Sequence, residues 1–256
     1  MADIVNGTNQ NLTFEKVLML AMKTPGVKIH RDKFLRKELV KYYPEAMVQQ
    51  AIDFNPAKAG IPKERINAIS RQVINYETTK ATGVSIAASL PSSGVAVAAV
   101  GAAAADITSY FAFILRVVQQ LAYLYGFDEF ELDENSVDAE TMNFIMVFLG
   151  VMFGVQGAAS SLAKLADVMA KHVAKTLAKK ALTKGTIYPI VKQIATKVGI
   201  RMTKQIFADT VASAIPIAGS VLSGALTFAM FRPCCMKLRK NLMSYNLCNP
   251  DYYVVE

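Results

Sequence analysis

The stretch ATGVSIAASLPSSGVAVAAVGAAAAD, residues 81–106, decides the fold, because no ionisable side chain occurs from Thr82 to Ala105. As one helix, these 24 residues would extend about 36 Å, enough to cross a hydrocarbon core of roughly 30 Å. Most of them are Ala, Ser and Gly, however, and only six are large and apolar. Because this composition makes insertion into a bilayer marginal, we expect the stretch to pack inside the protein.

A turn divides this stretch at Pro91-Ser92-Ser93-Gly94. Proline removes a helical hydrogen-bond donor, and a following serine can cap the next helix. The sequence therefore predicts two helices that meet at a tight turn. Within them, Gly83, Gly94 and Gly101 are expected to let neighbouring helices approach closely.

The residues on both sides of the stretch support long helices. Before it, a helix begins after Gly60-Ile61-Pro62 and carries an apolar stripe formed by Ile66, Ile69, Val73 and Tyr76. After it, a helix from about Val95 to Tyr125 ends where Gly126 can adopt the left-handed conformation of a C-cap. The two predicted helices form a hairpin.

Two further uncharged stretches span residues 141–163 and 210–231. The first is the most hydrophobic segment of the chain, and Gly150, Gly154 and Gly157 within it suit a closely packed core helix. A membrane span is the alternative for this segment, since its length approaches that of a transmembrane helix. We favour the core.

The third stretch resembles the first. Ile215-Pro216 and Gly219 repeat the pattern of Leu90-Pro91 and Gly94, and an arginine follows each turn, Arg116 in one case and Arg239 in the other. The repeat predicts two related hairpins, although chance similarity between Ala- and Gly-rich segments explains it equally well. The predicted fold is all-α: a single domain of long helices with two Gly/Ala-rich helical hairpins packed centrally.

Charge is strongly segregated along the chain. The net charge is +8, residues 128–140 carry seven acids and no base, and residues 164–204 carry ten Lys/Arg against Asp167 alone. The spacing of the first lysines predicts a basic amphipathic helix, with Leu165, Val168 and Met169 on another face. Its candidate lipid-binding residues are Lys164, Lys171, Lys175, Lys179, Lys180 and Lys184.

An anionic membrane surface is the partner that this basic segment fits best. Each Lys or Arg near anionic headgroups contributes about 1 kcal/mol to binding. Nucleic acid is not expected, because the segment contains one aromatic residue, Tyr188, and no recognisable reader motif.

The sequence lacks the usual signatures of enzymes, with no phosphate-binding loop, dinucleotide motif, nucleophile elbow or zinc motif. No cofactor or metal is expected, and the three cysteines are expected to be reduced thiols. Asp106 lies in an apolar helix and must find a partner, most simply as a structural anchor. Arg116 lies on a different side of that helix from Asp106. We expect Asp106, Arg116 and Asp128 to have a structural or functional role.

Short motifs along residues 58–243 resemble the EcsC family. They are Gly60-Ile61-Pro62 with Arg65-Ile66, Thr82-Gly83, Ala105-Asp106, Leu115-Arg116, Tyr125-Gly126-Phe127-Asp128, and Ile215-Pro216 with Gly219 and Gly224. Pro91 departs from the family pattern, which has a glycine-rich turn there, and residues 1–57 lie outside the resemblance. The family is named for a bacterial ABC-transporter operon, so the resemblance implies membrane association. It implies no particular chemistry.

These observations predict an N-terminal helical extension over residues 1–57, an EcsC-like domain over 58–243 and a tail over 244–256. No secretory signal is expected. The predicted function is that of a cytoplasmic protein peripheral to the inner face of the cell membrane and accessory to a transport or envelope process. A membrane protein complex such as a transporter is a further candidate partner. The alternatives are an integral or pore-forming effector whose three uncharged stretches insert as hairpins, and a lipid-directed enzyme that uses Asp106. The oligomeric state is left open.

Overall fold

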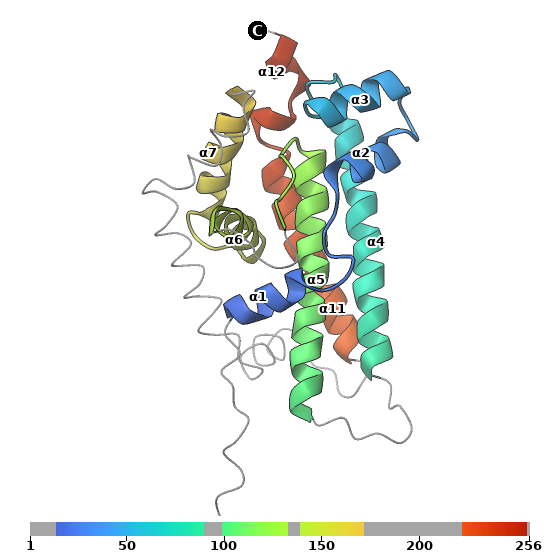
Figure 1. Ribbon diagram of the computed structural model, residues 1–256, viewed down its shortest axis with the longest axis vertical. Coiled ribbons are helices and arrows are strands. Elements are labelled where there is room, and N and C mark those ends of the chain that lie inside the picture. The colour runs from blue at the N-terminus through green and yellow to red at the C-terminus, as the bar shows by residue number, and fades with distance from the viewer. Residues whose placement is uncertain (1–13, 90–98, 133–138, 172–221, 255–256) are drawn as a thin grey trace, which may run out of the picture.

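A computed structural model describes residues 14–89, 99–132, 139–171 and 222–254, and within these ranges it contains helices and no strand (Figure 1). The predicted all-α fold is therefore confirmed. The α-helices are α1 (Phe14–Met22), α2 (Arg31–Leu39), α3 (Glu45–Asp53), α4 (Lys63–Ser89), α5 (Ala99–Leu124), α6 (Ala139–Phe153), α7 (Ala158–Lys171), α11 (Leu222–Leu242) and α12 (Pro250–Val254), and a 3-10 helix, η1, covers Asn246–Cys248.

The long helices α4, α5 and α11 form the centre of the molecule (Figure 1). Ile66, Ile69 and Val73 of α4 are buried as predicted, but the prediction for Tyr76 is wrong, because its side chain is 57% exposed. Glu77 is buried in its place. It lies eleven residues after Ile66, close to three full helical turns, so it falls nearer the middle of the buried stripe than Tyr76 does.

The end of α5 confirms the predicted C-cap. Gly126 has a φ of 97°, and its N–H donates to the Tyr123 carbonyl at 3.3 Å. The Phe127 N–H donates to the Ala122 carbonyl at 2.9 Å. These two bonds form a Schellman motif, which favours glycine because its left-handed backbone has no Cβ to clash.

The hydrophobic stretch 141–163 packs in the core as predicted, with Ile145 and Phe148 fully buried. It does not form one helix. Gly154 and Gly157 have φ angles of 69° and 84° and make the turn between α6 and α7. They end a helix rather than allow close packing along it, and α6 alone extends only about 22 Å.

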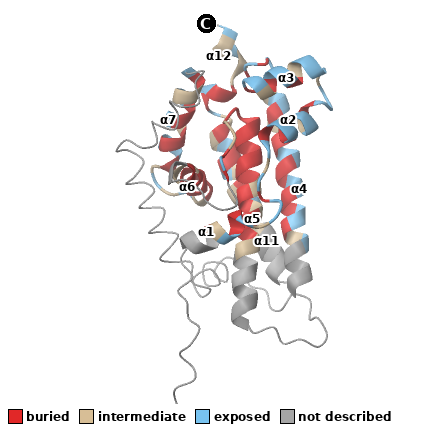
Figure 2. Ribbon diagram, in the orientation of Figure 1, coloured by how far each residue is buried: buried red, intermediate tan, exposed pale blue. Residues whose placement is uncertain are grey.

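One hydrophobic core joins the described parts of the chain. It includes Leu18 of α1, Leu35 of α2, Phe111 of α5, Leu149 of α6 and Leu247 of η1. Figure 2 shows buried residues gathered along α5, in α6 and on one side of α4. Residues from the predicted extension and the predicted tail thus pack on the same core as the central helices.

Three uncharged helix ends lie together at one end of the molecule, away from α2, α3 and α12 (Figure 1). They are residues 81–89 of α4, 99–105 of α5 and 222–231 of α11, and we call them the uncharged pole. Gly83, at the start of this region, is exposed and has no atom within 4 Å of the place where a Cβ would stand. The expected close helix approach at Gly83 is therefore wrong.

The two predicted hairpin turns, at Pro91 with Gly94 and at Pro216 with Gly219, lie outside the described residues. Gly101 lies on α5, and what packs against it is also outside the described part of the structure. Among the helices that the structure describes, none is both long enough and apolar enough to cross a bilayer.

Candidate functional site

The first part of the predicted basic amphipathic helix lies in α7. Leu162, Leu165 and Ala166 are buried on one side of it, and α7 packs against α6 and η1. Lys164 and Lys171 are exposed on the opposite side, together with Asp167. The other predicted lipid-binding residues, Lys175, Lys179, Lys180 and Lys184, lie outside the described part of the chain.

A second basic surface, not predicted from the sequence, borders the uncharged pole. We call Tyr76, Lys80 and Arg232 the collar. All three side chains are exposed; the Lys80 ammonium lies 5.1 Å from the centroid of the Tyr76 ring, and Arg232 Nε donates to Asn75 Oδ1 at 3.4 Å. The helix α11, which carries Arg232, has no acidic residue along its length. Aromatic and basic side chains together are typical of membrane interfaces.

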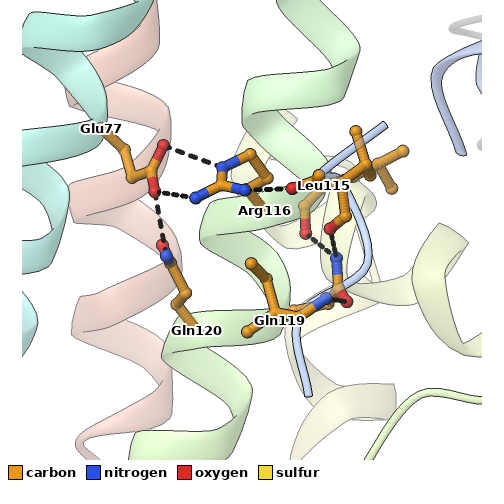
Figure 3. A network of polar contacts seen from close by, with 8 residues as sticks. Glu77, Leu115, Arg116, Gln119 and Gln120 are labelled. Carbon is orange, nitrogen blue, oxygen red and sulfur yellow. Dashed lines mark hydrogen bonds and ion pairs between the residues drawn. The ribbon is translucent and has the colours of Figure 1, made fainter. Parts of the chain in front are cut away.

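Arg116 is held in a network of polar contacts between α4 and α5 (Figure 3). Its Nη2 and Nε atoms donate to the two carboxylate oxygens of Glu77 at 2.8 Å and 3.2 Å, and Gln120 Nε2 donates to the same carboxylate at 2.9 Å. The Glu77 side chain is fully buried, whereas that of Arg116 is 20% exposed. The bidentate pair supplies the partner that a buried carboxylate requires.

The same network fixes the link between α1 and α2. Arg116 Nη1 also donates to the Gly26 carbonyl, and Gln119 Nε2 donates to the Val27 carbonyl at 2.8 Å. The Ile29 N–H returns a bond to Gln119 Oε1 at 2.9 Å. Because Arg116 is committed to these contacts, its role is to hold α4, α5 and the α1–α2 link together.

Arg239, the residue that corresponds to Arg116 in the proposed sequence repeat, also reaches α4. Its Nε donates to Ser70 Oγ at 2.9 Å and its Nη2 to the Asn67 carbonyl at 3.3 Å. The Tyr125 hydroxyl joins the group by donating to Asn67 Oδ1 at 2.7 Å. Burial raises the pKa of Tyr125 to about 12, so this hydroxyl stays protonated at neutral pH and can act as a donor.

Asp128, the third predicted polar residue, is half-buried beside a buried arginine, Arg31. Arg31 donates to the Phe127 carbonyl at 3.1 Å and to carbonyls at the end of α3, including that of Phe54 at 2.9 Å. Burial lowers the pKa of Arg31, and the charge of Asp128 opposes that shift. A cation at this position is favourable because the carbonyls at a helix C-terminus are electron-rich.

Asp106 lies on α5, and its side chain is outside the described part of the structure. Its predicted role as a buried anchor therefore stays a prediction.

The described residues offer little for catalysis. Cys234, Cys235 and Cys248 are free thiols, and burial raises the pKa of each of them. A raised pKa disfavours the thiolate, which is the nucleophilic form of cysteine. The described ranges also contain no group of three or more His, Cys, Asp or Glu residues that could hold a metal ion.

Glu77 and Arg31 are the main residues that sequence reasoning missed. Glu77 could have been found, because an acid that falls on the buried face of an amphipathic helix needs a basic partner. The position of Arg31 carries no such signal, since its acceptors are backbone carbonyls that only the folded chain brings together.

No protein-family model matches the chain, and no curated protein or solved structure does either.

Proposed function

We propose that this protein attaches peripherally to the cytoplasmic face of an anionic membrane and serves there as an accessory to a transport or envelope process. The observation that carries the proposal is the segregation of ten bases against one acid over residues 164–204, together with the exposure of Lys164 and Lys171 where that segment begins on α7. Anionic headgroups attract such a segment without requiring a shaped pocket.

Two further observations support this function. The collar adds exposed basic and aromatic side chains on α4 and α11, where lipid headgroups can contact them. The three free thiols fit a reducing compartment, which favours the cytoplasmic face. The accessory role rests on the resemblance to the EcsC family, and a transporter complex is the partner that this resemblance favours.

Vesicle flotation tests the electrostatic attachment. The wild-type chain is expected to float with vesicles that contain phosphatidylglycerol and to stay in the lower fraction with neutral phosphatidylcholine vesicles. Replacing Lys171, Lys175, Lys179 and Lys180 with Gln should weaken binding by at least a hundredfold, because each lysine contributes about 1 kcal/mol.

A matched control removes the same charge elsewhere. Lys33, Lys37, Lys41 and Lys58 are exposed on or near α2 and α3, and their replacement with Gln is expected to leave most of the binding intact. Equal flotation with both lipids, or equal loss in both variants, contradicts attachment through the basic segment.

A further inference from the structure

The outer sides of α4 and α11 form one exposed surface. The two helices pack against each other and run in opposite directions (Figure 1). Arg232 Nε of α11 donates to Asn75 Oδ1 of α4 at 3.4 Å, and both side chains are exposed, so this bond lies at the surface where the helices meet. In the interior, the buried Arg239 joins the same helices through Ser70. The exposed sides of the two helices therefore adjoin.

On α4, this surface consists of two neighbouring rows of exposed side chains. Residues four apart lie on the same side of a helix. Asn75 belongs to the row nearer α11, because it accepts the hydrogen bond from Arg232. The two rows are Arg71, Asn75 and Thr79, and Gln72, Tyr76 and Lys80.

On α11, the exposed side carries bases at the same spacing. Arg232 and Lys240 lie eight residues apart, and the partly buried Met236 lies between them on the same side of the helix. Lys237 is exposed next to Met236. Three bases of α11 therefore point outward beside the rows of α4.

Every formal charge on this surface is positive. The exposed side of α4 has no acid after Glu64, since the other acid of this helix, Glu77, is buried in its pair with Arg116. The sequence of α11 contains no acid. We call the five exposed bases the α4–α11 face, and Lys80 and Arg232 of the collar belong to it. They are Arg71, Lys80, Arg232, Lys237 and Lys240.

We infer that the α4–α11 face is a second contact surface for the anionic bilayer, which the central helices meet lengthwise rather than end-on. This inference rests on the proposed function and adds the surface and the orientation of the bound protein. Anionic headgroups complement a face that carries bases and no acid. The exposed Tyr76 ring beside Lys80 agrees with this environment, because tyrosine prefers the layer between hydrocarbon and water.

The spread of the bases favours a bilayer over other anionic partners. Residues 71–80 extend about 14 Å along α4, and residues 232–240 extend about 12 Å along α11. Lipid headgroups diffuse in the plane of the membrane and can reach bases spread over such a surface, whereas an acidic protein would need carboxylates matched to each position. A second copy of the chain would bring the same positive face, and like charges repel.

Neutralising the face tests the contact. The full-length variant with Arg71→Gln, Lys80→Gln, Lys237→Gln and Lys240→Gln keeps Arg232 and its bond to α4. Because all four side chains are exposed, its melting temperature should equal that of the wild type. Its binding to phosphatidylglycerol vesicles in flotation should be weaker by about tenfold or more. The control is the variant with Lys33, Lys37, Lys41 and Lys58 replaced with Gln, which loses the same charge and should bind nearly as the wild type does.

Tryptophan fluorescence tests the orientation, because the natural chain contains no tryptophan. A single tryptophan is introduced on the outer side of α4 as Thr79→Trp or, in a separate variant, as Gln72→Trp. The control is Gln50→Trp, at an exposed position on α3. Each variant is checked by circular dichroism and mixed with phosphatidylglycerol vesicles that contain lipids with a nitroxide on the headgroup. The nitroxide should quench most of the emission from α4 and leave the control emission nearly unchanged.

The variant on α4 that keeps the wild-type helix content is the one that decides. Vesicle binding without quenching on α4, or with equal quenching of the control, overturns the inferred orientation and leaves the proposed function standing. Unchanged vesicle binding after neutralisation also overturns the inference and favours an acidic protein as the occupant of the α4–α11 face. Absence of binding by the wild type in flotation overturns both the inference and the proposed function.

Discussion

The two ends of the central helices differ in how they are held together. Where α4 begins and α5 and α11 end, buried arginines make several hydrogen bonds each: Arg31 joins α2, α3 and the end of α5, and Arg239 joins α11 to α4. At the other end, the uncharged pole contains no ionisable residue on its helices. Polar networks thus fix the fold at one end, whereas the helix segments at the other end carry no ionisable residue.

The Glu77–Arg116 pair lies between these two ends. Glu77 lies on α4 between Tyr76 and Lys80 of the collar, and the hydrogen bond from Arg116 to the Gly26 carbonyl extends the order to the α1–α2 link. The contrast with Arg239 is also informative. Arg116 meets a carboxylate, whereas the hydrogen-bond acceptors of Arg239 among the described residues are a hydroxyl and a carbonyl.

Removing the central ion pair should have the largest effect on stability. Glu77→Ala leaves the Arg116 guanidinium largely buried without its carboxylate, and we expect it to lower the free energy of unfolding by about 3 to 5 kcal/mol. Urea denaturation followed by circular dichroism measures this change. The double variant Glu77→Leu with Arg116→Met should recover much of the loss, because it removes both charges. A Glu77→Ala variant as stable as the wild type contradicts the role given to the pair.

Asp106 marks the limit of the uncharged part of α5. If it is a buried anchor, Asp106→Ala should destabilise the fold by about 1 to 3 kcal/mol through the partner left unsatisfied. Vesicle binding of the folded fraction should survive, since the basic segment is intact. Thermal melts of Asp106→Ala and Asp106→Asn beside flotation measure both properties. A fully stable variant that no longer functions in cells would instead favour a functional role for this carboxylate.

Gly126 and Gly83 lie at opposite ends of the central helices, and only Gly126 has a positive φ. Gly126→Ala is expected to cost about 1 to 2 kcal/mol, because alanine is strained at positive φ; its Cβ would also lie 3.0 Å from the Leu247 carbonyl oxygen. Gly83→Ala is the matched control in regular helix with open space around it, and it should stabilise the fold by about 0.5 to 1 kcal/mol. Chemical denaturation of both variants tests the pair, and a loss at Gly83 equal to that at Gly126 would contradict the assignment.

The collar should influence binding more than folding. Tyr76→Ser removes an exposed ring, so we expect an unchanged melting temperature and a few-fold weaker association with phosphatidylglycerol vesicles. Tyr42→Ser, near the opposite end of α4, serves as the control and should bind as the wild type does. Equal weakening in both variants would show that the collar has no special part in the contact.

Much of the fold could be predicted from the sequence. Helix periodicity and the glycine after Tyr125 indicate α4 and the end of α5 with useful accuracy, because each depends on local backbone preferences. The burial of Glu77 follows from its place near the middle of the stripe, whereas Tyr76 lies about 100° away at the edge of the stripe, where an apolar ring is easily mistaken for a buried one. Only tertiary packing brings Arg116 and Gly26 together, ninety residues apart.

The candidate site was harder to predict than the fold. The basic segment is visible as a run of charge, but the collar combines Tyr76 and Lys80 with Arg232, and the pole combines segments from three helices. No local pattern indicates such a grouping. The uncharged stretches suggested hydrophobic helices, and the fold adds that three of their ends face the same way (Figure 1).

Hydrogen–deuterium exchange of the wild-type chain, with and without phosphatidylglycerol vesicles, tests most directly which part of the chain meets the membrane. We predict slower exchange on the vesicles in peptides that cover residues 164–204, and unchanged exchange in α2 and α3. Slower exchange in α2 and α3 with no change over residues 164–204 would contradict attachment through the basic segment.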